Sequence, residues 1–303
     1  MTESRAYLQS ELIQLRSLLN ELPEAAVIDR ISIESRLRRV QERLEKLPLE
    51  SRRSHTFLTF SGRPVDGSRG INAGFGSRAA NSFADAHAAV VAGMKEDLRY
   101  MGPIPDRAAH DLLIVGTAVG SFGFEFELPP VDPDLLQHKS LEESSVELIR
   151  DLMEVSATGS DDEISDIVER VHRRAVKKVS EFLGLLAQHE ALCSLSIGDK
   201  QFRYVNSDQL QASRAALAED NIRESEENLY GAFLGVLPKS RNFEFELAES
   251  RDVIRGKISS DIENPETINE YVGQLVQVTF EKIQVGQGRP RFTLKSTEAI
   301  SDR

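Results

Sequence analysis

Cysteine occurs only once in this 303-residue sequence, as Cys193. A single cysteine excludes an intramolecular disulfide and a zinc site made of several cysteines, and it fits a reducing compartment. Long apolar runs are also missing, since no stretch approaches the 18 consecutive apolar residues that a membrane span needs. The first residues are charged and do not form the apolar segment of a secretion signal. These absences predict a cytoplasmic protein without a membrane segment.

Basic residues are the minority charge, with 37 Lys and Arg against 49 Asp and Glu and a net charge of −12. An acidic excess disfavours non-specific adhesion to nucleic acid or to an anionic membrane. The six histidines are scattered, and no His-x-x-x-His pair, Cys/His cluster or Gly-x-Ser-x-Gly motif occurs. Spacing therefore indicates no catalytic residue, no metal ligand and no cofactor, and it favours a non-enzymatic protein.

The N-terminal residues 1–50 have the pattern of two helices broken near Pro23. Each helix carries one narrow apolar stripe with steps of three and four residues: Leu8, Leu12, Leu15, Leu19 and Leu22, then Ile33, Leu37, Val40, Leu44 and Leu47. A narrow stripe suits packing against one other helix better than burial in a broad core. We expect a helical hairpin or coiled coil that forms a homo-oligomer through residues 3–47, followed by a linker at 48–54.

Residues 55–220 are expected to form a central α+β domain with antiparallel hairpins and packed helices. The pattern predicts two strands around the Pro64–Gly67 turn, a helix at 77–98 capped by Ser77, and then two more strands. Two further helices and a second hairpin follow, and the second hairpin is expected to join the same sheet. The predicted elements after the first helix are strands 112–119 and 122–128, helices 133–154 and 161–189, strands 192–197 and 201–205, and helix 208–218.

A glycine-rich stretch, residues 61–78, is the first candidate site. Its five glycines and three arginines lead into a helix start, where backbone N–H groups and the helix dipole attract phosphate or carboxylate. The candidate anion-binding residues are Arg63, Arg69, Ser77 and Arg78. The spacing matches neither a P-loop nor a dinucleotide fingerprint, so tight turns and close helix packing are the alternative.

A basic stripe on the predicted helix 161–189 is the second candidate. Its five cations recur at three-residue and four-residue spacing: Arg170, Arg173, Arg174, Lys177 and Lys178. Such a stripe could contact a polyanion or an acidic partner. A solvated face, or one paired within the chain, is the alternative.

Residues 221–303 have the element order of a five-stranded OB-like β-barrel. Period-two alternation predicts strands 231–237, 242–248, 252–259, 274–285 and 291–294, with a helix at 265–271 between the third and fourth strands. Two loops of this barrel carry four cations, Lys239, Arg241, Arg289 and Arg291. Such loops bind nucleic acid, oligosaccharide or protein in OB-folds.

These features lead to three functional hypotheses. The preferred one is a non-enzymatic binding or assembly protein that self-associates and engages a protein partner. One alternative is an enzyme or sensor that binds a phosphorylated small molecule at the glycine-rich stretch. The other is a nucleic-acid-binding protein that uses the barrel and the basic stripe.

Overall fold

The structure, a computed structural model, describes residues 15, 19, 27–46, 54–95, 98–99, 101–117, 122–130 and 140–302. The chain divides into two compact units, Met1–Arg53 with Pro130–His138 and Ser54–Pro129 with Lys139–Arg303. The fold is mixed α+β. In the described ranges, no helix combines the length and the apolar character needed to cross a membrane.

The first unit contains helix α2 (Val27–Lys46), which confirms the second of the two predicted N-terminal helices. Its apolar stripe is packed, because Val40 is buried together with Leu15 while Ile33 and Leu37 lie against them. Leu15 and Leu19 are also helical. The rest of the predicted first helix and the predicted linker at 48–53 lie outside the described residues.

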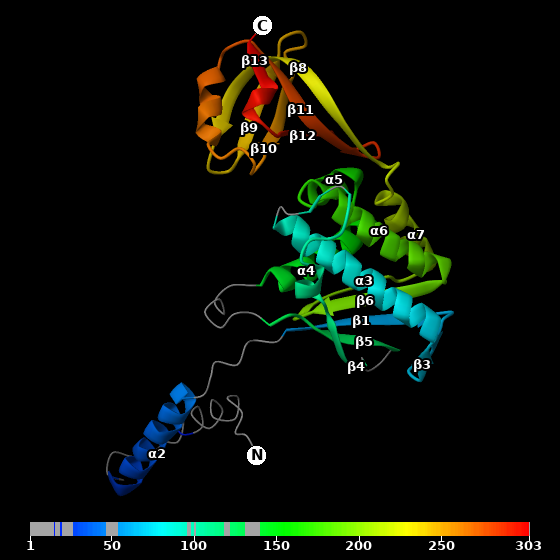
Figure 1. Cartoon of the computed structure of the whole chain (residues 1–303), viewed down its shortest axis with the longest axis vertical. Coiled ribbons are helices and arrows are strands. Elements are labelled where there is room, and N and C mark those ends of the chain that lie inside the picture. The colour runs from blue at the N-terminus through cyan, green and yellow to red at the C-terminus, as the bar shows by residue number, and fades with distance from the viewer. Residues whose placement is uncertain are drawn as a thin grey trace. The chain divides into compact units, whose positions relative to one another are not determined.

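The second unit is built on a five-stranded antiparallel sheet with the order β4-β5-β1-β6-β7. As expected, the second predicted hairpin belongs to this sheet. Helices α3, α4 and α6 lie along one face of it (Figure 1). The five strands are β1 (His55–Gly62), β4 (Leu113–Thr117), β5 (Phe122–Glu127), β6 (Ala191–Ile197) and β7 (Lys200–Arg203).

The predicted pairing of 56–62 with 70–75 is wrong. Strand β1 is the central strand and pairs with β5 and β6, while the turn region forms a separate small hairpin of β2 (Val65–Asp66) and β3 (Gly70–Ile71). Gly62 ends β1 with φ of +100°, and a Cβ atom there would lie 2.3 Å from the carbonyl oxygen of Glu190. This bend turns the chain out of the sheet. Both neighbours of β1 in the sheet are therefore strands that come later in the sequence.

Helix α3 (Ala73–Met94) begins four residues before the predicted start. Its N-cap is Asn72, whose side chain accepts a hydrogen bond from the Phe75 N–H, and Ser77 lies inside the first turns. The prediction that Ser77 caps this helix is therefore wrong, because Asn72 is an equally good cap and precedes Gly74 and Gly76. Gly76 lets the helix approach the sheet, since a Cβ there would lie 3.3 Å from the Phe124 ring.

The single helix predicted at 161–189 is two helices, α5 (Asp161–Val168) and α6 (Arg173–Gln188). His172 interrupts the helical backbone with ψ of 132°, and its ring accepts a hydrogen bond from the Arg174 N–H as a new N-cap. The apolar residues keep their helical spacing across this break, so the sequence pattern did not indicate it.

The other helices of the central part of the chain are η1 (Arg107–His110), α4 (Leu141–Thr158) and α7 (Ser207–Ala216). Residues 133–139 of the predicted helix 133–154 lie outside the described residues.

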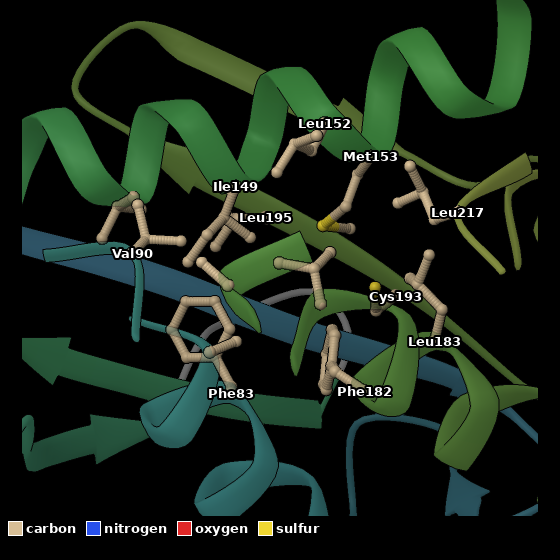
Figure 2. Close-up of a cluster of buried hydrophobic side chains, with 14 of the residues drawn as sticks. Phe83, Val90, Ile149, Leu152, Met153, Phe182, Leu183, Cys193, Leu195 and Leu217 are labelled. Atoms are coloured by element: carbon tan, nitrogen blue, oxygen red, sulfur yellow. The ribbon is translucent and has the colours of Figure 1, made fainter. Parts of the chain in front are cut away.

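The core of the second unit lies between the sheet and the helices. Figure 2 shows Phe83 of α3, Met153 of α4 and Phe182 of α6 meeting Leu195 of β6. Cys193 is fully buried in the same cluster, and this burial raises the pKa of its thiol. The thiol is therefore protonated and acts as a small apolar side chain.

The C-terminal strands form a closed five-stranded barrel, β8-β9-β10-β12-β11, in which β11 also pairs with β8. The helical turn η3 (Pro265–Tyr271) lies between the third and fourth strands, as expected. Three buried phenylalanines, Phe233, Phe245 and Phe280, pack edge to face inside the barrel. The strands are β8 (Ile222–Leu237), β9 (Asn242–Leu247), β10 (Val253–Ile258), β11 (Val276–Val285) and β12 (Arg291–Leu294), followed by η4 (Thr297–Ala299) and β13 (Ile300–Asp302).

Strand β8 begins nine residues before the predicted residue 231. Residues 222–226 of β8 pair with residues 281–285 of β11 in an extension of this ladder that we call the β8–β11 arm. One face of this arm is apolar near its end, where Ile222 and Val285 join the core of the central domain. The polar sequence of residues 223–228 gave no alternation signal, so the extension depends on pairing with β11.

Candidate binding sites

A cavity of about 440 Å³ lies between the start of α6 and the β8–β11 arm. The helix contributes His172, Arg173 and Val176, and the arm contributes Glu224 and Glu281. Further walls come from the turn between α5 and α6, from residues 257–261 at the end of β10 and just after it, and from Thr293 and Lys295. A pocket where two substructures meet is a common location for a ligand site.

Ion pairs line this cavity, and in two of them the carboxylate lies clearly deeper than its cationic partner. Arg173 contacts Glu224 at 2.9 Å and Lys295 contacts Glu281 at 3.0 Å. The side chains of Glu224 and Glu281 are 13% and 21% exposed, against 41% for Arg173 and 52% for Lys295. Two further pairs, Lys257 with Glu169 and Lys177 with Glu219, complete the lining.

The environment shifts the pKa of three groups in the cavity, and the contact with Lys177 lowers the pKa of Glu219. Burial raises the pKa of Glu224, and the nearby charge of Glu281 adds to this effect although Arg173 opposes it. Burial also lowers the pKa of His172, together with the positive charges of Lys295 and Arg174. His172 is therefore neutral at pH 7, as its role as acceptor for the Arg174 N–H requires. Shifted groups in a cleft are typical of functional sites.

The predicted basic stripe does not form one surface, because the break before α6 divides it. Arg173 and Lys177 line the cavity, and Arg170 lines it from the turn between the helices. Arg174 donates to the carbonyl groups of Arg99 and Gly102, and Lys178 pairs with Glu181 at 2.7 Å. Arg170 donates to the Asp166 carbonyl, so all five cations have partners within the chain.

The candidate anion-binding residues of the glycine-rich stretch do not converge on one point. Arg63 contacts Glu190 at 3.3 Å and Arg69 contacts Asp66 at 3.5 Å, both on the surface. Ser77 Oγ donates to the Gly74 carbonyl, and Arg78 bonds to the same carbonyl and to His189. A hollow beside the loop is lined by Arg63, Asn72 and His189, while the other three candidates are not among its lining residues.

The candidate cations of the barrel loops are largely engaged by the chain itself. Arg241 donates to the backbone carbonyls of Ile258, Ser259 and Ile262. Arg291 forms a 2.7 Å ion pair with Asp166 of α5, and the Arg289 N–H donates to Asp162. Lys239 is exposed at the other loop. The fourth-to-fifth-strand loop therefore holds the barrel against α5.

The outer edge of the central sheet is the second notable surface. Strand β4 pairs with β5 on one side and forms an edge in the described part of the sheet. Leu113, Ile114 and Val115 are consecutive there, with exposures of 59%, 50% and 44%. The strand contains neither a charged residue nor a proline, which are the residues that usually protect an edge from pairing with another chain.

Sequence reasoning missed Glu224, Glu281 and Lys295 as cavity residues. Nothing in their spacing connects them, because Glu224 and Glu281 meet only through the register of β8 with β11, in which Glu224 is opposite Ile283. A prediction that β8 begins at residue 222 would have been the one usable signal that Glu224 and Glu281 are close. The sequence contains the apolar run of β4, but it does not show that this strand lies at the edge of the sheet.

Among the described residues, no group of three or more His, Cys, Asp or Glu side chains is arranged to hold a metal ion. Comparison with protein-family models, with curated protein sequences and with solved structures finds no significant match to this chain.

Proposed function

We propose that the chain is a non-enzymatic binding and assembly protein that engages an extended segment of a partner protein along the outer edge of β4. The observation that carries this proposal is the run of three exposed apolar residues, Leu113 to Val115, on an edge strand. A partner strand added there gains main-chain hydrogen bonds, and its apolar side chains cover those of β4. The favoured partner segment is extended, apolar and rich in β-branched residues.

Self-association through the N-terminal helices is the second part of the proposal. Helix α2 buries a narrow stripe, Ile33, Leu37 and Val40, against the segment that contains Leu15. A helix of 20 residues with a narrow apolar stripe buries little apolar area by itself, so pairing with a second copy would add burial. The partner-binding edge would then be presented in more than one copy, which increases avidity.

We further propose an OB-like assignment for the barrel, with a structural role. The strand order β8-β9-β10-β12-β11 and the helical turn between the third and fourth strands support the assignment. Its fourth-to-fifth-strand loop, which binds ligands in OB-folds, contacts Asp161 and Asp162 of α5. This contact supports a barrel that stabilises the central domain.

Site-specific photo-crosslinking tests the β4 edge in the full-length protein. A benzophenone amino acid replaces Ile114 in one variant and Val205, which is 77% exposed near the opposite edge, in a matched control. We expect position 114 to cross-link one recurring extended segment, identified by mass spectrometry, and position 205 not to do so. A synthetic peptide of that segment should bind the wild-type protein and lose binding to Ile114→Lys. Equal cross-linking at both positions, or peptide binding that Ile114→Lys leaves unchanged, contradicts the proposal.

A further inference from the structure

The face of the central sheet that points away from the helices carries a glutamate next to the β4 edge. Glu125 of β5 is opposite Phe57 of β1 on one side and opposite Gly116 of β4 on the other. Phe57 is 37% exposed, whereas its neighbours in β1, Thr56 and Leu58, are fully buried. Because side chains opposite one another share a face of the sheet, Glu125 and Gly116 belong to this open face.

The Glu125 carboxylate lies over the edge strand because residue 116 is a glycine. A bulge between Ile114 and Gly116 shifts the alternation of β4 by one residue, so Gly116 takes the position opposite Glu125. A Cβ atom on Gly116 would lie 2.7 Å from the Glu125 Oε2 atom. The Oε1 atom accepts a hydrogen bond from His55 Nδ1 at 2.7 Å. Oε2 therefore lies one strand spacing, about 4.8 Å, closer to the outer edge than the backbone of β5.

Charge at this end of the sheet has one sign. Strands β4, β5 and β1 contain no lysine or arginine, and their acidic residues are Glu125 and Glu127. The basic residues of the sheet, Lys200 and Arg203, both lie on β7 at the opposite end of the strand order. A partner with an acidic side chain here would meet Glu125 without a balancing cation, whereas a lysine or arginine would find an acceptor.

A segment that pairs with β4 has side chains that alternate between the two faces of the sheet. Those on the helix side cover Ile114, which is 50% exposed and lies opposite the buried Phe126. Those on the open side lie beside Gly116, within reach of the Glu125 carboxylate for a long basic side chain.

We propose that the partner segment alternates apolar residues with lysine or arginine, and that one of its cations binds Glu125 across Gly116. This inference rests on the proposed pairing at β4, and it adds the charge and the alternation of the partner. Gly116 then has a role in recognition, because a side chain at that position would separate Glu125 from the partner strand.

The test uses the full-length protein at constant ionic strength, with synthetic peptides as probes and fluorescence anisotropy as the measurement. The lysine peptide is Val-Lys-Ile-Lys-Val-Lys-Ile, and its copies carry glutamine or glutamate in place of every lysine. We expect the lysine peptide to bind at least about tenfold more tightly than the glutamate peptide, with the glutamine peptide between them.

Three variants separate charge recognition from strand pairing. Glu125→Gln should weaken binding of the lysine peptide by about threefold to tenfold and leave the glutamine peptide unchanged, because it removes charge alone. Glu249→Gln is the matched control, since it removes the same charge at an exposed residue of the turn between β9 and β10. Ile114→Lys should weaken binding of the uncharged glutamine peptide, because it acts on the pairing edge itself.

The two proposals fail in different ways. If Ile114→Lys weakens the glutamine peptide but the wild-type protein binds the lysine and glutamine peptides equally, pairing at β4 stands and the charge inference is wrong. Equal weakening of the lysine peptide by Glu125→Gln and Glu249→Gln also overturns it, because this indicates general attraction to a chain of net charge −12. If no peptide binds, or if Ile114→Lys changes nothing, pairing at β4 fails and the charge inference fails with it.

Circular dichroism without peptide checks that each variant is folded. If Glu125→Gln does not fold, the comparison of lysine and glutamine peptides on the wild-type and Glu249→Gln proteins still decides the question.

Discussion

Glu142, at the start of α4, connects three elements through one carboxylate. Its Oε1 atom lies 2.8 Å from His110 Nδ1 of η1, and its Oε2 atom lies 3.3 Å from His87 Nε2 of α3. Lys95 contacts His110 Nε2 at 3.1 Å. Because an ammonium group only donates, His110 Nε2 accepts from Lys95, and the Nδ1–H of His110 donates to Glu142. The carboxylate thus accepts a hydrogen bond from η1 and also contacts His87 of α3.

Burial by itself would raise the pKa of Glu142. The close contacts with His87 and His110 outweigh this effect, and the pKa of Glu142 lies below its ordinary value. A carboxyl group whose pKa is lowered on folding stabilises the folded state at any pH above its unfolded-state pKa. That contribution is lost as the pH falls through the lower, folded-state pKa.

We therefore expect Glu142→Gln to reduce the free energy of unfolding at pH 7 by about 1–3 kcal/mol, the usual cost of breaking hydrogen bonds to a buried charged group. The difference from wild type should shrink as the pH falls through the folded-state pKa of Glu142, which lies below the ordinary value of a glutamate. Urea unfolding followed at several pH values measures it. Glu154→Gln, on the exposed side of the same helix, is the control and should change stability by less than about 0.5 kcal/mol. A loss that is independent of pH would contradict this assignment.

The loop between β11 and β12 is held against α5 by backbone and side-chain contacts. The Gln287 N–H donates to Asp161 at 2.8 Å, and the Arg289 N–H donates to Asp162 at 2.6 Å. Gly286 approaches so closely that a Cβ atom there would lie 2.4 Å from Asp161 Oδ2. Its φ of +53° is also a conformation that glycine adopts more readily than other residues.

Replacement of Gly286 by alanine should push this loop away from α5. We expect the amide protons of Gln287 and Arg289 to exchange at least about tenfold faster, since each loses a hydrogen bond to a carboxylate. Hydrogen-exchange mass spectrometry measures this. Gly67→Ala is a matched control, because Gly67 has the same φ of +53° but open space around its Cβ position. Unchanged exchange in Gly286→Ala, or an equal effect of Gly67→Ala, would show that the contact with Asp161 does not hold the loop.

Nucleic-acid binding should be weak for the intact protein. The net charge of −12 opposes it, and Arg289, Arg291, Arg173 and Lys177 all lie near carboxylates of the same chain. We expect filter binding with single-stranded and double-stranded oligonucleotides to give no submicromolar affinity at physiological salt. Submicromolar binding that is lost on replacing Arg173, Arg174 and Lys177 with Glu would reverse this conclusion.

Self-association should depend on the N-terminal helices. Light scattering on the full-length protein should give a mass above that of one 33.8 kDa chain, and a chain that starts at Ser54 should give a monomeric mass. In the full-length protein, Leu37→Glu should lower the mass because it places a charge in the apolar stripe, whereas Arg38→Glu on the exposed side should not. If the full-length chain and the shortened chain both give the mass of a single chain, this oligomer is ruled out.

The sequence alone determined the features that depend on near neighbours in the chain. Alternation of apolar and polar residues placed β9 and β12, and helical spacing placed α2 and α7 to within a few residues, because these periods follow from local geometry. The tertiary structure decided what depends on distant partners. It made β1 the central strand, extended β8 to Ile222 along β11, and brought Glu224 beside Glu281. Strand register and side-chain convergence arise from pairing between segments far apart in sequence, and a local pattern carries no information about which segments pair.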